Sequence, residues 1–112
     1  MPAAPESLEL RVGGSARFPS SELTIVFEKV ESDSRCPTGV TCVWEGDAVV
    51  RLSVGVPGKE QAALTLHTHP TREQEATHAG FVVRLAALTP HPTRERAIEA
   101  SEYRARLTVT RK

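Results

Sequence analysis

Apolar and polar residues alternate with a period of two along most of this chain. Because successive side chains of a β-strand point to opposite faces of the sheet, this alternation predicts strands with one buried face. The alternation is cleanest over residues 47–56. In residues 23–30 it predicts that Val26 and Val30 point away from the buried face. Residues 81–88 are almost entirely apolar, which predicts a strand that is buried more completely. The expected strands cover residues 8–12, 16–18, 23–30, 47–56, 61–67, 81–88 and 103–109.

Residues that favour turns separate these segments. Residues 13–14 and 57–58 are turn signals, and residues 70–80 are polar without a period, as in a loop. Thr93 could cap one or two turns of helix over residues 94–100. About seven strands with almost no helix predict an all-β, single-domain antiparallel β-sandwich, with a small closed β-barrel as the alternative.

The length of 112 residues indicates one domain, which we expect to span residues 7–112. Residues 1–6 are rich in Pro and Ala, which suits a flexible N-terminal tether, although a ragged end would look the same. Met1 is not followed by a signal peptide. If the protein is exported, a leader was removed and Met1 was added, and the full-length precursor could carry a lipid tether.

The charge balance narrows the choice of partners. Fourteen basic and fourteen acidic side chains give a formal net charge of zero, so the chain lacks the electrostatic signature of a nucleic-acid-binding protein. No apolar run approaches the length of a membrane span. We therefore expect neither nucleic-acid binding nor a membrane span. The sequence does not identify the partner, for which another exported protein is the candidate.

Two cysteines, Cys36 and Cys42, are separated by five residues that include Pro37 and Gly39. A turn of this length can bring two Cα atoms within disulfide range, and a disulfide would indicate an oxidising compartment. A free buried pair and one half of a metal site are the alternatives. Trp44 lies two residues beyond Cys42 and would share its face in a strand. It either covers the disulfide at one end of the core or is an exposed binding anchor.

The stretch from Asp33 to Gly46 resembles a signature of small bacterial exported proteins, many of them lipoproteins. The resemblance rests on Asp-Ser-Arg-Cys-Pro, on Val40, on the paired Cys-Val-Trp and on the final glycine. Glu45 stands where that signature has a small residue. It implies an extracytoplasmic location (periplasmic, secreted or membrane-tethered) and brings no catalytic residue to this chain. The signature residues expected to matter are Asp33, Arg35, Pro37, Trp44 and Gly46, with residues 35–41 exposed.

Candidate chemistry outside this stretch is sparse. His67 and His69 lie on one face of an expected strand and are the candidates for a metal site, provided that His78 or His91 supplies a third ligand. The sequence contains no nucleophile elbow, phosphate-binding glycine loop or His-Glu-x-x-His motif. We therefore expect a non-catalytic binding or interaction domain without a cofactor or a metal. A periplasmic metal-binding protein and an enzyme inhibitor are the alternatives.

Overall fold

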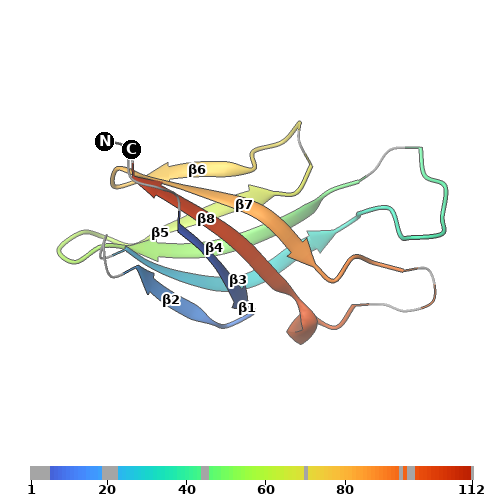
Figure 1. Ribbon diagram of the computed structural model, residues 1–112, viewed down its shortest axis with the longest axis horizontal. Helices are drawn as coiled ribbons and strands as arrows, with labels where there is room; N and C mark the ends of the chain where they lie inside the picture. Colours follow the sequence, from blue (N-terminus) through green and yellow to red (C-terminus); the bar gives the residue numbers. More distant parts are fainter. Residues whose placement is uncertain are drawn as a thin grey trace.

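The computed structural model describes residues 6–18, 23–43, 46–69, 71–93, 95 and 98–111. Its strands form two four-stranded antiparallel sheets that pack face to face (Figure 1). The predicted β-sandwich is confirmed, and the closed barrel is wrong because the two sheets remain separate. In spatial order, one sheet consists of β1 (Glu6–Arg11), β8 (Arg104–Arg111), β7 (Phe81–Thr89) and β6 (Glu75–His78), and the other of β2 (Ser15–Phe18), β3 (Leu23–Asp33), β4 (Ala48–Gly55) and β5 (Ala62–His67).

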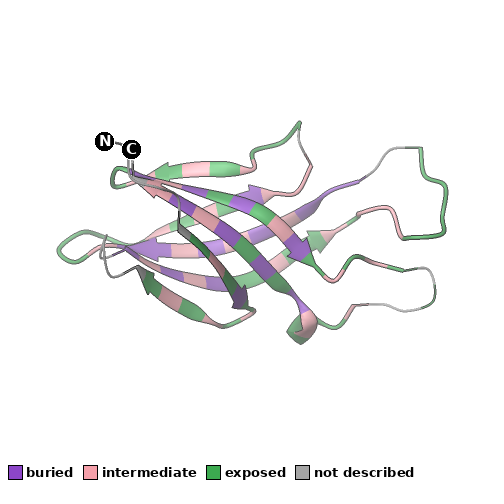
Figure 2. Ribbon diagram, in the orientation of Figure 1, coloured by how far each residue is buried: buried purple, intermediate pink, exposed green. Residues whose placement is uncertain are grey.

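The core lies between the sheets and is built from the predicted alternation. Along β4 every second residue is buried, and buried and more exposed positions alternate as stripes across the strands (Figure 2). Burial of one large aliphatic or aromatic side chain contributes about 1.5 to 3 kcal/mol, so this layer is the main source of stability. The largest fully buried side chains are Phe27, Leu23, Ile25, Leu52, Leu66, Leu107, Val50, Val54 and Val83.

Bulges in β3 and β7 change which residues face the core. The register between β3 and β4 shifts after Phe27, and Val30 packs against the core instead of facing away from it. Strand β7 is buried on one face only, because Arg84 and Ala86 are exposed, so the prediction of a more completely buried strand is wrong. A register shift after Leu85 brings Leu88 back to the core. One extra residue in a strand reverses the alternation, which strict period-two reasoning does not foresee.

Two segments differ from the expected elements. Residues 75–78, expected to lie in a loop, form β6 and pair with the start of β7. Of the expected helix over residues 94–100, residues 94, 96 and 97 lie outside the described residues, and Ala100 begins one 3-10 turn, η1 (Ala100–Glu102). Thr93, the expected helix cap, forms a parallel β-bridge with Thr38.

The connections β3–β4, β5–β6 and β7–β8 extend toward one end of the molecule, on the right in Figure 1. We call this region the loop end; its described residues are 33–43, 46–47, 67–69, 71–75 and 89–93. Both terminal strands have their outer ends at the opposite side, because Glu6 of β1 pairs with Val109 of β8. The molecule measures 46 × 27 × 21 Å, so the loop end lies at one pole of an elongated domain.

Candidate functional site

The connection between β3 and β4 begins as a continuation of the two strands. Ser34 donates its backbone N–H to the carbonyl oxygen of Asp47 at 2.7 Å, and its hydroxyl donates to the same oxygen at 2.9 Å. Gly46 lies against this closure with a φ of +78°, and a Cβ at this position would overlap the backbone of Ser34 and Arg35. Glycine is required here for two reasons, its positive φ and the close backbone approach.

Three side chains meet beside this connection: Asp33 and Arg35 are two positions apart, and Tyr103 is 70 positions away from Asp33. Arg35 donates from Nε to Oδ1 and from Nη2 to Oδ2 of Asp33, both at 2.8 Å. Its Nη1 donates to the carbonyl oxygen of Leu88 at 2.7 Å, and its Nη2 also donates to that of Pro90 at 2.9 Å. The hydroxyl of Tyr103 donates to Oδ2 of Asp33 at 2.8 Å. The cluster therefore fastens the β3–β4 connection to the end of β7 and the start of β8.

Burial and hydrogen bonding act in opposite directions on this cluster. Burial raises the pKa of Asp33, but hydrogen bonds from Arg35 and Tyr103 and the charge of Arg35 outweigh it, so the net pKa lies below the usual 3.8. For Tyr103, burial, the hydrogen bond to Asp33 and the negative charge of that carboxylate raise the pKa to about 12. Asp33 therefore remains ionised and Tyr103 remains protonated across the neutral range.

The expectation that residues 35–41 are exposed is confirmed for residues 38–41 and is wrong for Arg35. Its side chain is only 9% exposed, and that of Asp33 is 11% exposed. A bidentate guanidinium–carboxylate pair that is also bonded to two carbonyl groups is strong and directional. Arg35 therefore holds the loop in place instead of presenting a charge to a partner.

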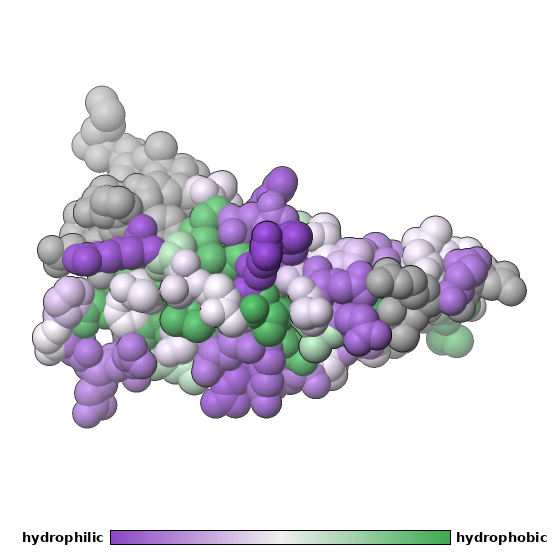
Figure 3. Space-filling view, turned by 90° about the horizontal axis from the view of Figure 1, so that it is seen from below, coloured by the Kyte–Doolittle hydropathy of each residue, from purple (hydrophilic) through white to green (hydrophobic). Residues whose placement is uncertain are grey.

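The tip of the loop is closed by the predicted disulfide between Cys36 and Cys42, whose Cα atoms lie 6.0 Å apart. Residues 38–43 are exposed, including Val40 at 42% and Val43 at 107% of its reference area. These two valines are the large hydrophobic residues that the described part of the chain exposes. The space-filling view shows a hydrophobic spot among polar residues at the corresponding pole (Figure 3).

The disulfide loop also lies against the segment that follows β7. Thr38 donates its backbone N–H to the carbonyl oxygen of Pro92 at 2.9 Å and forms its bridge with Thr93. Nε2 of His91 lies 2.9 Å from the carbonyl oxygen of Cys36, so the ring must donate from that nitrogen. The covalent link and these cross-loop bonds together restrict the conformations that the tip can adopt.

Asp47 organises the adjacent β5–β6 connection. Its Oδ1 accepts the backbone N–H groups of Thr68 and His69 at 3.1 and 3.0 Å, and its Oδ2 lies 2.6 Å from Nδ1 of His67. Burial raises the pKa of Asp47, but the hydrogen bond with His67 and the backbone donors outweigh it and the net pKa lies below the usual value. Since an ionised carboxylate only accepts hydrogen bonds, Nδ1 of His67 carries the proton.

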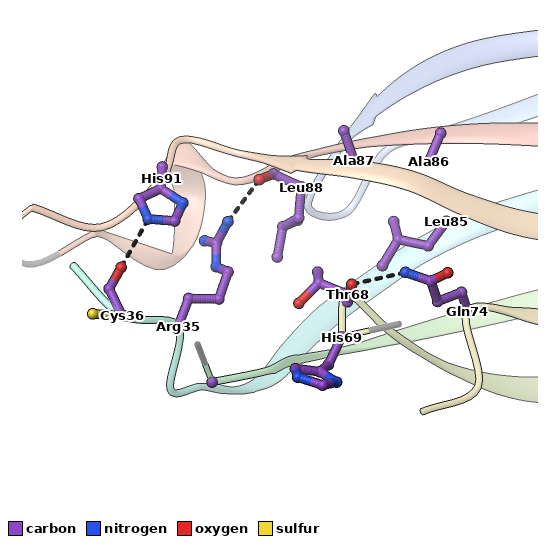
Figure 4. Close-up of a pocket in the computed structure, with 11 residues that line it drawn as sticks. Arg35, Cys36, Thr68, His69, Gln74, Leu85, Ala86, Ala87, Leu88 and His91 are labelled. Carbon is purple, nitrogen blue, oxygen red and sulfur yellow. Dashed lines mark hydrogen bonds between the residues drawn. The ribbon is translucent and has the colours of Figure 1, made fainter. Parts of the chain in front are cut away.

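A cleft of about 370 Å³ opens between these connections and the second half of β7 (Figure 4). Leu85 and Leu88 supply apolar surface, and Arg35, His69 and His91 supply polar surface. Strand β6 pairs with β7 only as far as Arg84, so the later residues of β7 have no neighbouring strand on the side of the cleft. A volume of this size accommodates a small molecule or a few side chains of a bound peptide.

No family model, curated protein or solved structure matches this chain. Of the segments that the structure describes, none is a helix with the length and apolar character needed to cross a bilayer. What the loop end can bind is therefore argued from its own residues.

The structure places the predicted site residues in two groups. Asp33, Arg35 and Gly46 shape the base of the loop, and Cys36, Cys42 and the half-buried Pro37 form its tip. Trp44 lies outside the described residues, so both hypotheses about its role stay predictions.

The two candidate metal ligands are held apart by different partners. His67 faces Asp47, whereas His69 lines the cleft, and its Nδ1 accepts the backbone N–H of Thr71 at 3.1 Å. Among the residues with described positions, no three His, Cys, Asp or Glu side chains form a group that could hold a metal ion.

Sequence reasoning missed Asp47 and Tyr103 as parts of the site, and it named His91 only as a possible third metal ligand. The alternation over residues 47–56 puts Asp47 on the polar face, yet Asp47 is only 8% exposed. Its backbone donors Thr68 and His69 lie more than twenty positions away, so no local pattern indicates this role. For Tyr103, 70 positions away from Asp33, no local pattern indicates the contact.

Proposed function

We propose that this chain is a non-catalytic binding domain that acts outside the cytoplasm and binds another protein through its loop end. The observation that carries the proposal is the exposure of Val40, inside the ring that the Cys36–Cys42 disulfide closes, and of Val43, directly after it. Burying one valine contributes about 1.5 to 3 kcal/mol, and a loop that is already restrained loses little conformational entropy on binding. The partner that fits a protruding apolar tip is a protein with a concave apolar site, such as an enzyme cleft.

The disulfide supports an oxidising compartment, as does the resemblance of residues 33–46 to exported bacterial proteins. A catalytic role has less support at this end of the molecule. The nearest approach to a nucleophile and base is Oγ1 of Thr71, which lies 2.7 Å from Nδ1 of His69. The same nitrogen accepts the backbone N–H of Thr71, so a local turn accounts for this contact.

A photo-crosslinking residue at position 43 tests the proposal in the native cell envelope. We expect a discrete crosslinked adduct at Val43 and none when the probe replaces Lys59, which is exposed in the β4–β5 turn. With the captured partner purified, Val40→Asp together with Val43→Asp should weaken binding by roughly a hundredfold, since each valine contributes about 1.5 kcal/mol or more. Equal adducts at both positions, or unchanged affinity of the double variant, would contradict the proposal.

A metal-binding role makes a separate prediction. Because His67 faces Asp47 while His69 lines the cleft, and the described residues place no third ligand beside them, we expect no tight zinc or copper site on this pair. Protein dialysed after metal loading should retain no stoichiometric metal. Retention that disappears in His67→Ala would overturn this expectation.

A further inference from the structure

Each sheet of the sandwich ends in two edge strands, and the four edges are not equally protected. The edges are β1 and β6 in one sheet and β2 and β5 in the other. An unpaired strand edge presents backbone N–H and C=O groups that can pair with another chain, so proteins commonly protect edges with short strands, charges, proline or bulges. Strands β2 and β6 are only four residues long, and β1 carries Glu9 and Arg11.

Strand β5 has none of these protections. It has six residues, Ala-Ala-Leu-Thr-Leu-His, without a Lys, Arg, Asp, Glu or Pro, and its pairing with β4 is regular over the whole strand. Its solvent-facing residues Ala63 and Thr65 are small and exposed. In the described part of the fold, β5 is therefore the edge best suited to pair with another strand.

The direction of the free backbone groups can be read from one hydrogen bond. His67 donates its backbone N–H away from β4, to the carbonyl oxygen of Glu73 at 2.7 Å. Because alternate residues of a strand direct their backbone groups to the same side, those of Ala63 and Thr65 also point away from β4. No strand of the described fold is hydrogen-bonded to β5 on that side, although β6 of the other sheet lies nearby. The loop residue Glu73 covers only the end of the edge at His67.

We propose that a second copy of this chain pairs with β5 in antiparallel orientation, about a two-fold axis at Leu64. The outward groups of Ala63 and Thr65 are placed symmetrically about Leu64, so Ala63 of each copy lies opposite Thr65 of the other. Every outward N–H then meets an outward carbonyl group. The two sheets that contain β5 become one continuous sheet across the axis.

The side chains around this axis are compatible with self-pairing. Leu64, which packs against the core while partly exposed, meets its own copy and becomes more buried. Ala63 and Thr65 carry no charge, and the neighbouring Arg51 is paired with Glu28 and Glu31 at 3.7 and 3.1 Å. Like charges therefore do not face each other across the axis, as they would at an edge designed to prevent pairing.

Sedimentation velocity over a range of concentrations tests the pairing. We expect a reversible monomer–dimer equilibrium for the unmodified chain, and monomer alone for Thr65→Lys, which sets a charge beside the axis. Thr77→Lys is the matched control, because Thr77 is an exposed threonine on the edge strand β6, and it should dimerise as the unmodified chain does. Both variants should retain the circular dichroism spectrum of the native fold.

Single cysteines test the register of the pairing. A residue on the axis lies directly opposite its own copy, with Cα atoms about 4.5 Å apart, which is within disulfide range. Leu64→Cys should therefore give a crosslinked dimer on non-reducing gels, and Ala62→Cys, which lies opposite Leu66 of the other copy, should not. A chain that stays monomeric at every concentration, a dimer unaffected by Thr65→Lys, or crosslinking at position 62 instead of 64 would overturn the proposal.

Discussion

Tyr103 provides a direct test of the buried cluster, because it is the only tyrosine of the chain. Its hydroxyl donates to Asp33 at 2.8 Å, and the residue is only 8% exposed. Burial together with the neighbouring carboxylate raises its pKa from 10.0 to about 12. We therefore expect the native protein to form phenolate at a much higher pH than the unfolded protein does.

The same shift predicts how stability depends on pH. When the pKa of a group is higher in the native state than in the unfolded state, the group contributes its full stabilisation at pH values below the unfolded-state pKa. This contribution is lost as the pH rises through the native-state pKa. The rise from 10.0 to about 12 corresponds to about 3 kcal/mol, at 1.36 kcal/mol per pKa unit. The free energy of unfolding should therefore fall between pH 10 and about pH 12, by an amount of this order.

Near-ultraviolet absorbance of the phenolate measures both quantities. Native protein is brought to each alkaline pH by rapid mixing and read before it unfolds, and urea-denatured protein supplies the reference. In Asp33→Asn the native pKa of Tyr103 should fall, because the carboxylate charge is removed while the cation of Arg35 remains. Glu31→Gln, an exposed acidic residue of β3, is the control and should leave the titration unchanged. If native and denatured Tyr103 ionise at the same pH, the inferred burial of this hydroxyl is wrong.

Three further substitutions test the rest of the loop end, with chemical denaturation as the common assay. Arg35→Ala leaves the carboxylate of Asp33 buried without its cation and should lower stability by about 3 to 5 kcal/mol; a loss below about 1 kcal/mol would mean that the pair is solvated. Gly46→Ala should lower stability far more than Gly58→Ala, because both glycines have a positive φ but only Gly46 lacks space for a Cβ. Equal losses of stability would refute the close approach of Gly46 to the backbone of Ser34 and Arg35. Replacing both Cys36 and Cys42 by Ser should cost about 2 kcal/mol without loss of the fold, and unfolding of this variant would show that the disulfide is indispensable.

The sequence predicted the fold well because the core depends on a local pattern. Alternation over residues 47–56 identified β4 and its buried face correctly. Strand β6 was missed because Glu75–His78 contains a single apolar residue and obtains its pairing from β7. The orientation of Val30 was missed because a bulge depends on the partner strand as well as on the strand itself.

The site was predictable only where its contacts are short in sequence. The disulfide across five intervening residues and the hydrogen bond from the backbone of Arg35 to Asp33, two positions away, follow from turn geometry. The inward orientation of the Arg35 side chain does not, because its partners Leu88 and Pro90 are more than fifty positions away. A charged residue in a loop is usually solvated, and its burial requires acceptors that only the folded chain assembles.

The positions of the terminal strands determine how the domain can be presented to its surroundings. Because Glu6 pairs with Val109, a polypeptide or lipid attached before β1 or after β8 would leave from the pole opposite the disulfide loop. An anchored molecule would then act as a spacer up to 46 Å long, with its valine tip directed away from the attachment surface. Antiparallel pairing through β5 would point the attachment points of the two copies in opposite directions. Copies anchored upright on the same flat surface could not pair in this way, so anchoring and pairing would compete.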